Sequence, residues 1–351
     1  MRWVNHIIAL CCVFFCSIGF GTENTFYVLH TNPQQIAALN QTLSLVKQHA
    51  HAIRILISQA YQIDETGKVS GYLNPELAEL AQAHSIKLMA MATNVGFDQA
   101  KVHQFLSSDT AQENALAFLL AECQKYHLYG VQFDFEMISI QDKAALTHFF
   151  QLAAERLHQA GFAVSYAVIP AFTDDLQSSL FLKKTYQNWS GAYDLKALGQ
   201  CSDFVTIMAY NQHPEGTTPG PTASAAWVEA AIRQTLKYMP ARKISLGIPA
   251  YSLYWYTGPA PFSTRVSTQR LEIAYLDAKN IIEKNHSKIA WNKIDKVHYA
   301  VYEHHWLNEY VYLEDVNSFK VKLSLAKKYH LRGVSIFRIG TEDKRIWRVI
   351  S

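Results

Sequence analysis

The sequence predicts an α/β fold of the (β/α)8 (TIM) barrel type, with a small α+β insertion between the seventh and eighth strands. From residue 25 onward, short runs of β-branched or aromatic residues alternate with longer runs of helical period. This alternation is typical of parallel strands joined by helices. Eight strand-like runs occur in 351 residues, and a barrel of this type needs about 250 residues. With 49% hydrophobic and 17% charged residues, the chain has the composition of a globular protein.

Each predicted strand is bounded by turn residues or by a helical pattern. The eight predicted strands are 25–30, 52–58, 86–93, 130–136, 163–170, 204–210, 243–249 and 333–339. A doubly wound open sheet is the alternative arrangement for such a chain. No glycine-rich phosphate-binding loop follows the first strand, which favours the barrel.

The insertion is predicted from the length of the last connection. More than 80 residues separate the seventh and eighth strands, too many for one connecting helix. The run "KVHYAVYEHHWLNEYVYLED" has the pattern of two aromatic strands with a turn near Leu307 and Asn308. We therefore assign about 253–313 to a subdomain beside the barrel mouth, within a single catalytic unit spanning 22–351.

The first 21 residues have the pattern of a secretory signal peptide. Arg2 precedes an apolar run over 7–20, and small residues follow. The run is shorter than the roughly 20 residues of a membrane span. We expect cleavage, a secreted or periplasmic protein, and no stable membrane anchor afterwards. Only Cys123 and Cys201 lie beyond this leader, so at most one disulfide can form, and the sequence leaves their pairing open.

Charge and histidine content bear on the partners of the protein. The formal charge is +3, and no basic block is present, so we predict no nucleic-acid partner. The densest histidine run is "EHHW", but adjacent residues on a strand point to opposite faces, so His304 and His305 would not share an ion. We predict no metal site and no cofactor, and we expect a monomer.

The segment "YGVQFDFEMI" at 129–138 combines carboxylates with a buried-strand pattern. Side chains alternate along a strand, so Gln132, Asp134 and Glu136 share one face. The apolar residues between them suit the helix side of a barrel wall, which turns the polar set inward. Burying carboxylates is costly unless hydrogen bonds replace their hydration. An amphipathic strand with its acids in water remains the alternative at this point.

Glu136 lies at the carboxyl end of the strand, where barrel enzymes place their catalytic groups. Asp134 lies two residues before it, roughly 6.6 Å away along the backbone. A neighbouring negative charge raises the pKa of a carboxyl group, and a raised pKa suits a general acid near neutral pH. We therefore predict that Glu136 is the acid and Asp134 its electrostatic partner.

The same stretch resembles the D-G-x-D-x-D-x-E strand of the chitinase-like glycoside hydrolases of family 18. Asp134 and Glu136 match the last two acids, whereas Tyr129 and Gln132 stand where the family has Asp. Three further runs resemble the sixth, seventh and eighth strands of the family: "TIMAYN" with Met208, Tyr210 and Asn211 in place of M-x-Y-D, "GIPAYSLYW", and "GVSIFRIGTED" with Phe337 in place of the usual Trp. The chain is most similar to the bacterial branch of spore-cortex and cell-wall N-acetylglucosaminidases and to chitobiase-like members.

This resemblance implies substrate-assisted retaining hydrolysis, in which the acetamide oxygen of the sugar is the nucleophile. It implies that Glu136 is the general acid and later the general base, that Asp134 stabilises the charge developing on the acetamide, and that Tyr210 donates its hydroxyl to the acetamide oxygen. Gln132 is expected to hydrogen-bond Asp134. Further expected substrate-binding residues are Met208, Asn211, Trp255 as a stacking ring and Phe337 as the floor of the sugar site. The neutral Gln132 and Asn211 imply a lower pKa for Asp134 than the family has, and reduced activity.

Two functions of different classes remain open on the sequence. The first is an exported hydrolase of β-1,4-linked N-acetylglucosamine, in chitin oligomers or in peptidoglycan. The second is a non-catalytic, lectin-type protein on the same scaffold, although such proteins usually lose the catalytic Glu that is present here as Glu136. A deacetylase would need metal ligands that the sequence does not offer. The sequence does not separate chitin from peptidoglycan, or endo from exo cleavage.

Overall fold

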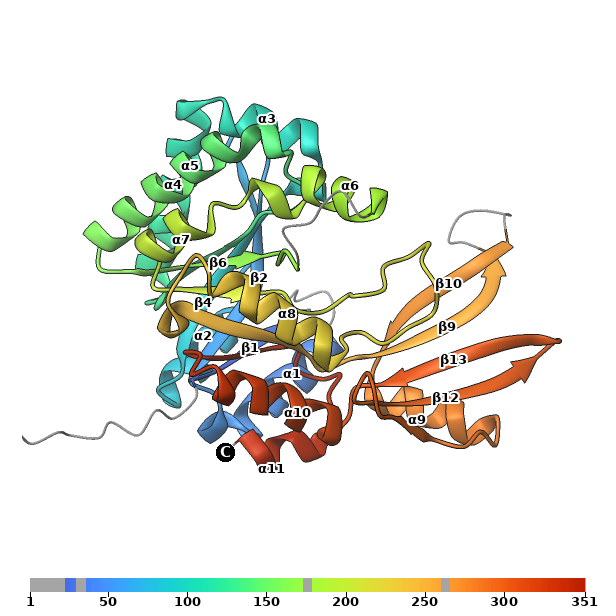
Figure 1. Cartoon of the computed structure of the whole chain (residues 1–351). Helices are drawn as coiled ribbons and strands as arrows, with labels where there is room; N and C mark the ends of the chain where they lie inside the picture. Colours follow the sequence, from blue (N-terminus) through green and yellow to red (C-terminus); the bar gives the residue numbers. More distant parts are fainter. Residues whose placement is uncertain (1–22, 30–35, 173–178, 260–265, 351) are drawn as a thin grey trace, which may run out of the picture.

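The computed structural model describes residues 23–29, 36–172, 179–259 and 266–350 (Figure 1). Its centre is a closed barrel of parallel strands. These are β1 (Glu23–Val28), β2 (Ile55–Ile63), β4 (Lys87–Asn94), β5 (Gly130–Asp134), β6 (Ala163–Val168), β7 (Phe204–Ile207), β8 (Ile244–Pro249) and β14 (Gly333–Phe337). β1 pairs with both β14 and β2, which closes the ring and excludes the open doubly wound sheet. β3 (Val69–Gly71) adds an antiparallel hairpin strand to β2.

All eight predicted strands overlap the observed ones, so the predicted barrel is confirmed. The largest difference is at β2, which ends at Ile63 where the prediction ended at 58, whereas the predicted strands 130–136 and 204–210 run past the ends of β5 and β7. Backbone pairing with the neighbouring strands stops there, and the residues beyond it bend into the site described below.

Helices surround the barrel and cover the outer side of its strands (Figure 1). They are α1 (Ile36–Gln48), α2 (Pro75–Ala83), α3 (Gln99–Leu106), α4 (Asp109–Lys125), α5 (Lys143–Gln159), α6 (Leu180–Asn188), α7 (Leu195–Cys201), α8 (Ala225–Thr235), α10 (Val316–Lys328) and α11 (Trp347–Ile350). On β5, Phe133 and the following Phe135 pack against Phe149 of α5, with ring centroids 5.5 and 5.6 Å apart. The apolar side chains of this segment therefore face the helices, as predicted, which turns the alternating polar set inward.

A layer of hydrogen-bonded polar side chains fills the barrel lumen around Gln132. Its members are buried and come from six strands. The bonds run from the Tyr27 hydroxyl to Gln132 Oε1 (2.8 Å), from Gln132 Nε2 to Ser165 Oγ (2.9 Å) and Thr206 Oγ1 (3.4 Å), and on through Thr206–Ser335 (3.1 Å) and Ser335–Ser245 (2.6 Å). The expected bond from Gln132 to Asp134 is therefore wrong, because both ends of the amide are already engaged by the lumen layer.

The predicted insertion between the seventh and eighth barrel strands is a five-stranded antiparallel sheet with one helix, which projects from one side of the barrel (Figure 1). Its elements are β9 (Ser252–Pro259), β10 (Val266–Ile273), α9 (Tyr275–Lys284), β11 (Ala290–Asn292), β12 (Val297–His304) and β13 (Leu307–Leu313). Ala278 and Ile282 of α9 pack on one face of this sheet, against Ala300, Val311 and Leu313. The opposite face is free to meet the barrel.

The turn between β12 and β13 is formed by His305 and Trp306, both with positive φ, directly before the predicted Leu307 and Asn308, which begin β13. Because His305 has left the strand, its ring lies 4.1 Å from that of His304. The premise that these two rings point to opposite faces is therefore wrong. His304 Nδ1 is hydrogen-bonded to Glu309 (3.0 Å).

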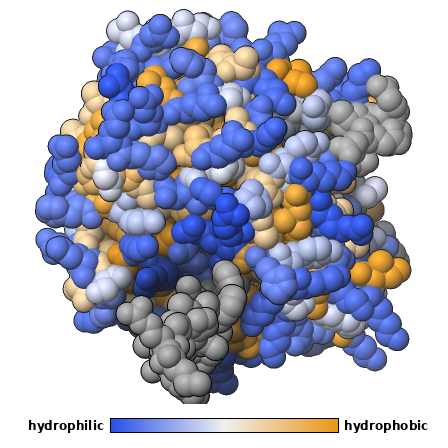
Figure 2. Space-filling view, turned by 60° about the vertical axis from the view of Figure 1, so that its left-hand side comes forward, coloured by the Kyte–Doolittle hydropathy of each residue, from blue (hydrophilic) through white to orange (hydrophobic). Residues whose placement is uncertain are grey.

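Hydrophilic side chains cover most of one face of the molecule (Figure 2), and both described cysteines are free. Figure 2 shows one face on which hydrophilic side chains dominate and hydrophobic ones form small scattered groups. Cys123 is buried, Cys201 is half-buried, and both are free thiols. In the described part of the chain, no helix is long and apolar enough to cross a membrane.

Candidate active site

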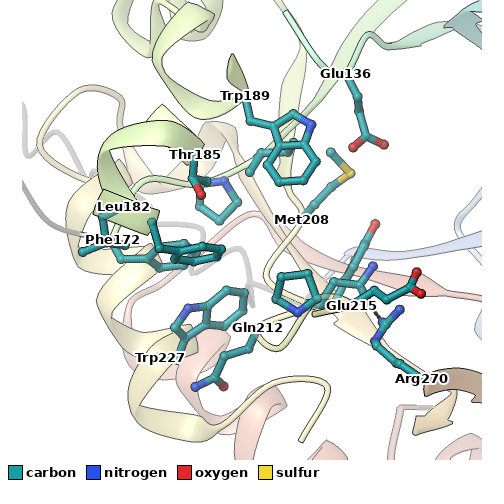
Figure 3. A pocket seen from close by; sticks show the side chains of 16 residues that line it. Glu136, Phe172, Leu182, Thr185, Trp189, Met208, Gln212, Glu215, Trp227 and Arg270 are labelled. Carbon is teal, nitrogen blue, oxygen red and sulfur yellow. Dashed lines mark hydrogen bonds between the residues drawn. The ribbon is translucent and has the colours of Figure 1, made fainter. Parts of the chain in front are cut away.

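A cavity of about 260 Å³ opens at the carboxyl end of the barrel strands, with Glu136 in its wall (Figure 3). The other lining residues come from five places: the segment after β6, helix α6 and its end, the loop that follows β7, helix α8, and strand β10 of the insertion. A cavity at this end of a barrel is where parallel-strand enzymes place their chemistry.

Asn94, the last residue of β4, holds the backbone of Glu136. Its Nδ2 donates to the Glu136 carbonyl oxygen (3.0 Å), and its Oδ1 accepts from the Glu136 backbone N–H (2.9 Å). The side-chain amide thus continues the pairing between β4 and β5 beyond the point where the backbone ladder ends. These two hydrogen bonds hold the peptide groups on both sides of Glu136 and so fix where its side chain begins.

Neighbouring backbone groups are held from two further directions. The Tyr193 hydroxyl donates to the carbonyl of Phe135 (2.7 Å), and Gln99 Nε2 donates to the carbonyl of Met137 (3.3 Å). Met137 itself has a φ of 57°, which turns the chain sharply after Glu136. Every peptide from 135 to 137 is therefore anchored, and the carboxyl group projects from a fixed backbone.

Asp134 is buried and Glu136 is half-buried, and their carboxyl groups interact. Burial raises the pKa of Glu136 from its ordinary 4.5 to about 7. Burial and then the charge of Glu136 raise the pKa of Asp134 well above its ordinary value. Burial, and not the charge of Asp134, is therefore the main cause of the raised Glu136 pKa, which corrects the cause predicted from the sequence. The effect of burial on the Asp134 pKa also outweighs any lowering of that pKa by the neutral Gln132. Burial therefore shifts both groups toward the protonated form, and Glu136 is partly protonated near pH 7.

One oxygen of this pair has no partner. Oδ1 of Asp134 is buried and accepts no hydrogen bond from any residue that the structure describes. A buried acceptor without a donor is costly to the folded protein. Asp134 does not itself line the cavity, but it lies two residues before Glu136, which does.

The structure brings Tyr210 and Met208 to this carboxyl pair. Both side chains line the cavity with Glu136, from the segment that follows β7. Burial raises the pKa of the Tyr210 hydroxyl well above its ordinary value, with further contributions from Asp134 and Glu136. The hydroxyl therefore stays protonated and can donate. Phe337 stacks on the Tyr210 ring with centroids 5.5 Å apart, and it supports that ring from behind instead of lining the cavity as its floor.

Asn211 lines the cavity as predicted, and its side chain is engaged by two donors. Its Oδ1 accepts from the Tyr251 hydroxyl (2.6 Å) and from Nη2 of Arg270. Arg270 belongs to β10 of the insertion and is not among the site residues predicted from the sequence. No local pattern marks it, because only the folding of the insertion carries it to the barrel mouth.

Trp255 does not lie in the cavity, which corrects the prediction that it stacks on a sugar. The side chain is 1% exposed and packs with Tyr251, Leu253 and the partly buried Tyr310. Its Nε1 donates to the carbonyl of Gly220 (2.9 Å), in the loop between β7 and α8. A ring enclosed in this way has no face for a ligand, and its role is to seat the inserted sheet on that loop.

The aromatic side chains that do line the cavity come from helices and loops. Trp189, at the end of α6, lies beside Glu136 and Met208 (Figure 3). Trp227 of α8 stacks on Phe172 with centroids 4.3 Å apart, and both line the same cavity. Trp189 was not among the site residues predicted from the sequence. Trp227 was missed, because on an amphipathic helix a tryptophan is usually part of the core.

The raised pKa values predict that the protein loses stability as pH rises. Below pH 4.5 Glu136 is protonated in both the folded and the unfolded chain. Between pH 4.5 and about 7 it ionises in the unfolded chain but stays protonated in the folded chain. The contribution of Glu136 to the free energy of unfolding therefore falls as pH rises through this range. The free energy of unfolding, measured with urea, should be lower at pH 7.5 than at pH 5 in the wild type. In Glu136→Gln this fall should be smaller than in the wild type, by roughly 3 kcal/mol at most. Glu283→Gln, at a side chain that is 67% exposed, is the control and should leave the fall unchanged. An equal fall in wild type and Glu136→Gln would contradict the burial of this carboxyl group.

Comparison with known proteins places this geometry in a family. The model of the glycosyl hydrolases family 18 matches residues 27–342. The uncharacterized glycosylase YvbX of Bacillus subtilis is 26% identical over 313 residues, which cover 88% of this chain and 86% of that protein. The cortical fragment-lytic enzyme of the same organism is 25% identical over 83% of this chain, but this chain spans only 66% of its length.

Solved structures share the fold. The spore cortex-lytic enzyme SleL of Bacillus megaterium has a TM-score of 0.80 at 22% identity, over 94% of this chain and 73% of that chain. The likeness in structure agrees with the match in sequence along nearly the whole barrel. The chain belongs to glycosyl hydrolase family 18 and is a glycoside hydrolase.

Proposed function

We propose that this protein cleaves β-1,4-linked N-acetylglucosamine glycans with retention of configuration, using the acetamide group of the substrate as the nucleophile. The observation that carries the proposal is the interacting carboxyl pair, Asp134 and Glu136, with Glu136 and Tyr210 in the wall of one cavity. A single protonated carboxyl group suffices for such chemistry, because the second reacting group arrives with the sugar.

In the first step the acetamide oxygen attacks the anomeric carbon, and the bond from that carbon to the leaving glycosidic oxygen breaks. Glu136 gives its proton to the leaving oxygen and becomes a carboxylate. Positive charge develops on the oxazolinium ring that forms. The unpartnered Oδ1 of Asp134 accepts the acetamide N–H and stabilises this charge, while the Tyr210 hydroxyl donates to the acetamide oxygen and orients it.

In the second step water attacks the anomeric carbon from the side that the leaving group vacated. The Glu136 carboxylate takes a proton from that water, the bond to the acetamide oxygen breaks, and the acetamide is restored. Two inversions at the same carbon give net retention. Glu136 ends the cycle protonated, as its pKa of about 7 favours near neutral pH.

The relatives support a cell-wall or related glycan as the substrate. One relative is named a cortical fragment-lytic enzyme and one solved neighbour a spore cortex-lytic enzyme. Residues 1–21, which lie outside the described residues, have the pattern of a signal peptide, and we include export in the proposal. Cell fractionation of the full-length chain, compared with a chain lacking these residues, tests that part separately.

Replacing Glu136 tests the proposed acid. Glu136→Gln should lower kcat on fluorogenic N-acetylglucosamine or chitobiose substrates by about 10²- to 10⁴-fold, because proton transfer is lost. Substrate binding, measured by calorimetry, and the folded circular dichroism spectrum should be retained. Activity equal to that of wild type would refute the assigned role.

The wild-type protein in the same assays separates catalysis from lectin-type binding. Binding without any turnover over days would favour a non-catalytic protein. A matched substrate that lacks the 2-acetamido group should not be cleaved if the sugar supplies the nucleophile, and acetate release without new reducing ends would indicate a deacetylase.

The dependence of rate on pH follows from the acid role of Glu136. The proton that it donates is lost as pH rises through about 7, so kcat/KM should fall by about tenfold per pH unit above that value. The measurement is a profile from pH 5 to 9 on a substrate whose leaving group does not titrate in this range. A profile that stays flat to pH 9 would rule out this pKa for the acid.

Asn94 is predicted to act as a positioning residue for Glu136. Asn94→Ala removes both bonds to the Glu136 peptide, so kcat should fall by about tenfold or more while KM changes little, because misplacement of a catalytic group affects mainly the chemical step. Asn94→Asp keeps the acceptor for the Glu136 N–H and should recover part of the loss. If KM alone rises, or if both variants simply melt earlier with unchanged kcat, Asn94 has no positioning role.

A further inference from the structure

The proposed function leaves the charge of the glycan open. Chitin-type chains carry no charge, whereas muramic-acid glycans carry a lactyl ether and peptide stems that end in carboxyl groups. Resting on that proposed function, we propose that Arg270 binds a carboxylate of the glycan and so makes acidic, muramic-acid-type glycans the preferred substrate class.

The pairing of the inserted strands directs Arg270 to the barrel mouth. Arg270 of β10 lies opposite Trp255 of β9, and Trp255 lies opposite Tyr310 of β13. Directly paired residues share one face of a sheet, and this face is the one that seats on the loop after β7 through the Trp255 bond to Gly220. Arg270 therefore points from the insertion to the cavity, which it lines together with Glu136 (Figure 3).

Arg270 is the only positively charged side chain among the described residues that line the cavity. Its side chain is 13% exposed, so solvent screens its charge poorly. Nη2 donates to Asn211 Oδ1 and to Glu272 Oε1 (3.2 Å), while Nε is buried and has no partner among the described residues. A guanidinium group has five N–H donors, and these contacts leave part of it unsatisfied.

Asn211 makes this guanidinium group an anion site. The residue is a neutral amide at a position where the similar strand motif has Asp, so it adds no negative charge beside Arg270. Its Oδ1 is already shared with the Tyr251 hydroxyl (2.6 Å). The remaining counter-ion in contact, Glu272, is 32% exposed and meets the guanidinium group through one contact of 3.2 Å instead of a bidentate pair. A bound carboxylate can supply the missing charge and accept two parallel hydrogen bonds from the planar group.

Two acids in the cavity wall oppose a bound anion. Glu136 is partly neutral near pH 7, because burial raises its pKa to about 7. Glu215 also lines the cavity, on the side where Arg270 lies in Figure 3. Glu215 is therefore the side chain that limits the affinity for an anionic glycan. Replacing it with a neutral residue should increase the preference for acidic over uncharged glycans.

The carboxylate can come from two parts of a muramic-acid glycan. The lactyl carboxyl group is free only after an amide-cleaving reaction has removed the peptide stem. A stem that is still attached offers its own carboxylates at a greater distance from the sugar. The two sources share the chemistry that Arg270 recognises, and the substrates below distinguish them.

The test compares matched glycans of equal length on the full-length protein. They are a stem-free N-acetylglucosamine–muramic acid oligomer, its lactyl methyl ester, a stem-bearing muropeptide and an uncharged chitooligosaccharide. The wild-type kcat/KM should be about tenfold or more higher for the free acid than for its ester, as expected for a charge-assisted pair, and added salt should reduce this ratio. If instead the stem-bearing form alone shows a preference that Arg270 controls, the carboxylate lies on the peptide.

Variants assign the preference to Arg270. Arg270→Gln should bring the acid-to-ester ratio close to one, Arg270→Lys should keep part of it, and Asn211→Asp should lower it by supplying the counter-charge internally. Glu272→Gln and Glu215→Gln remove opposing charges and should raise it. The variants that add or remove a charge around an intact Arg270 keep the test valid even if Arg270→Gln folds poorly.

Equal wild-type rates on acid and ester, or a preference that persists in Arg270→Gln, would overturn the inference. These results differ from failure of the proposed function. A protein that cleaves chitooligosaccharides and esters without any preference for charge is still a hydrolase of these glycans, whereas a protein that cleaves none of the four substrates is not.

Discussion

Two carboxyl groups held out of water at the end of β5 are the constraint on which the rest of this site depends. The alternation of the strand requires that Asp134 and Glu136 face the lumen once Phe133 and Phe135 pack against α5. Their dehydration is unfavourable, and it raises the pKa of both groups. The same loss of hydration keeps a proton on Glu136 available for transfer near neutral pH. Stability and reactivity are therefore set by one physical cause, the exclusion of water from this part of the barrel.

Two neutral side-chain amides, those of Asn94 and Gln132, form the hydrogen bonds that hold the backbone and fill the lumen around these acids. Asn94 holds the peptide of Glu136 by both of its amide atoms, and Gln132 joins the lumen layer through Tyr27 and Ser165. A carboxylate at position 132 would add a third negative charge below the pair and would require a further proton or cation. With an amide there, the lumen is filled and hydrogen-bonded, and the titration of the site is confined to Asp134 and Glu136.

Much of this arrangement could be predicted from the sequence, and the limits have physical reasons. The barrel strands were predictable because buried parallel strands are short apolar runs between helical patterns. Asp134 and Glu136 were predictable because the period of a strand fixes which residues share a face. Trp255 was wrongly placed, since position after a barrel strand does not reveal that the chain continues as β9 and turns this ring into a core. Arg270 had no local signal, because its distance from the barrel mouth is decided by tertiary pairing alone.

The barrel supplies the proposed catalytic residues, and the insertion supplies a positively charged residue of the cavity wall, Arg270. The carboxyl pair, Tyr210 and the positioning amide Asn94 all belong to the barrel strands or to the residues that directly follow them, where the closed sheet restricts movement. Arg270 comes instead from an antiparallel sheet that is seated on the barrel by the Trp255 bond to Gly220 and by the Arg270 bond to Asn211. Substitutions on β10 can therefore change the charge of the cavity wall without altering the strands that hold the acid. The chemistry of the reaction and the choice of glycan are thus encoded in separate parts of the chain that meet at Asn211.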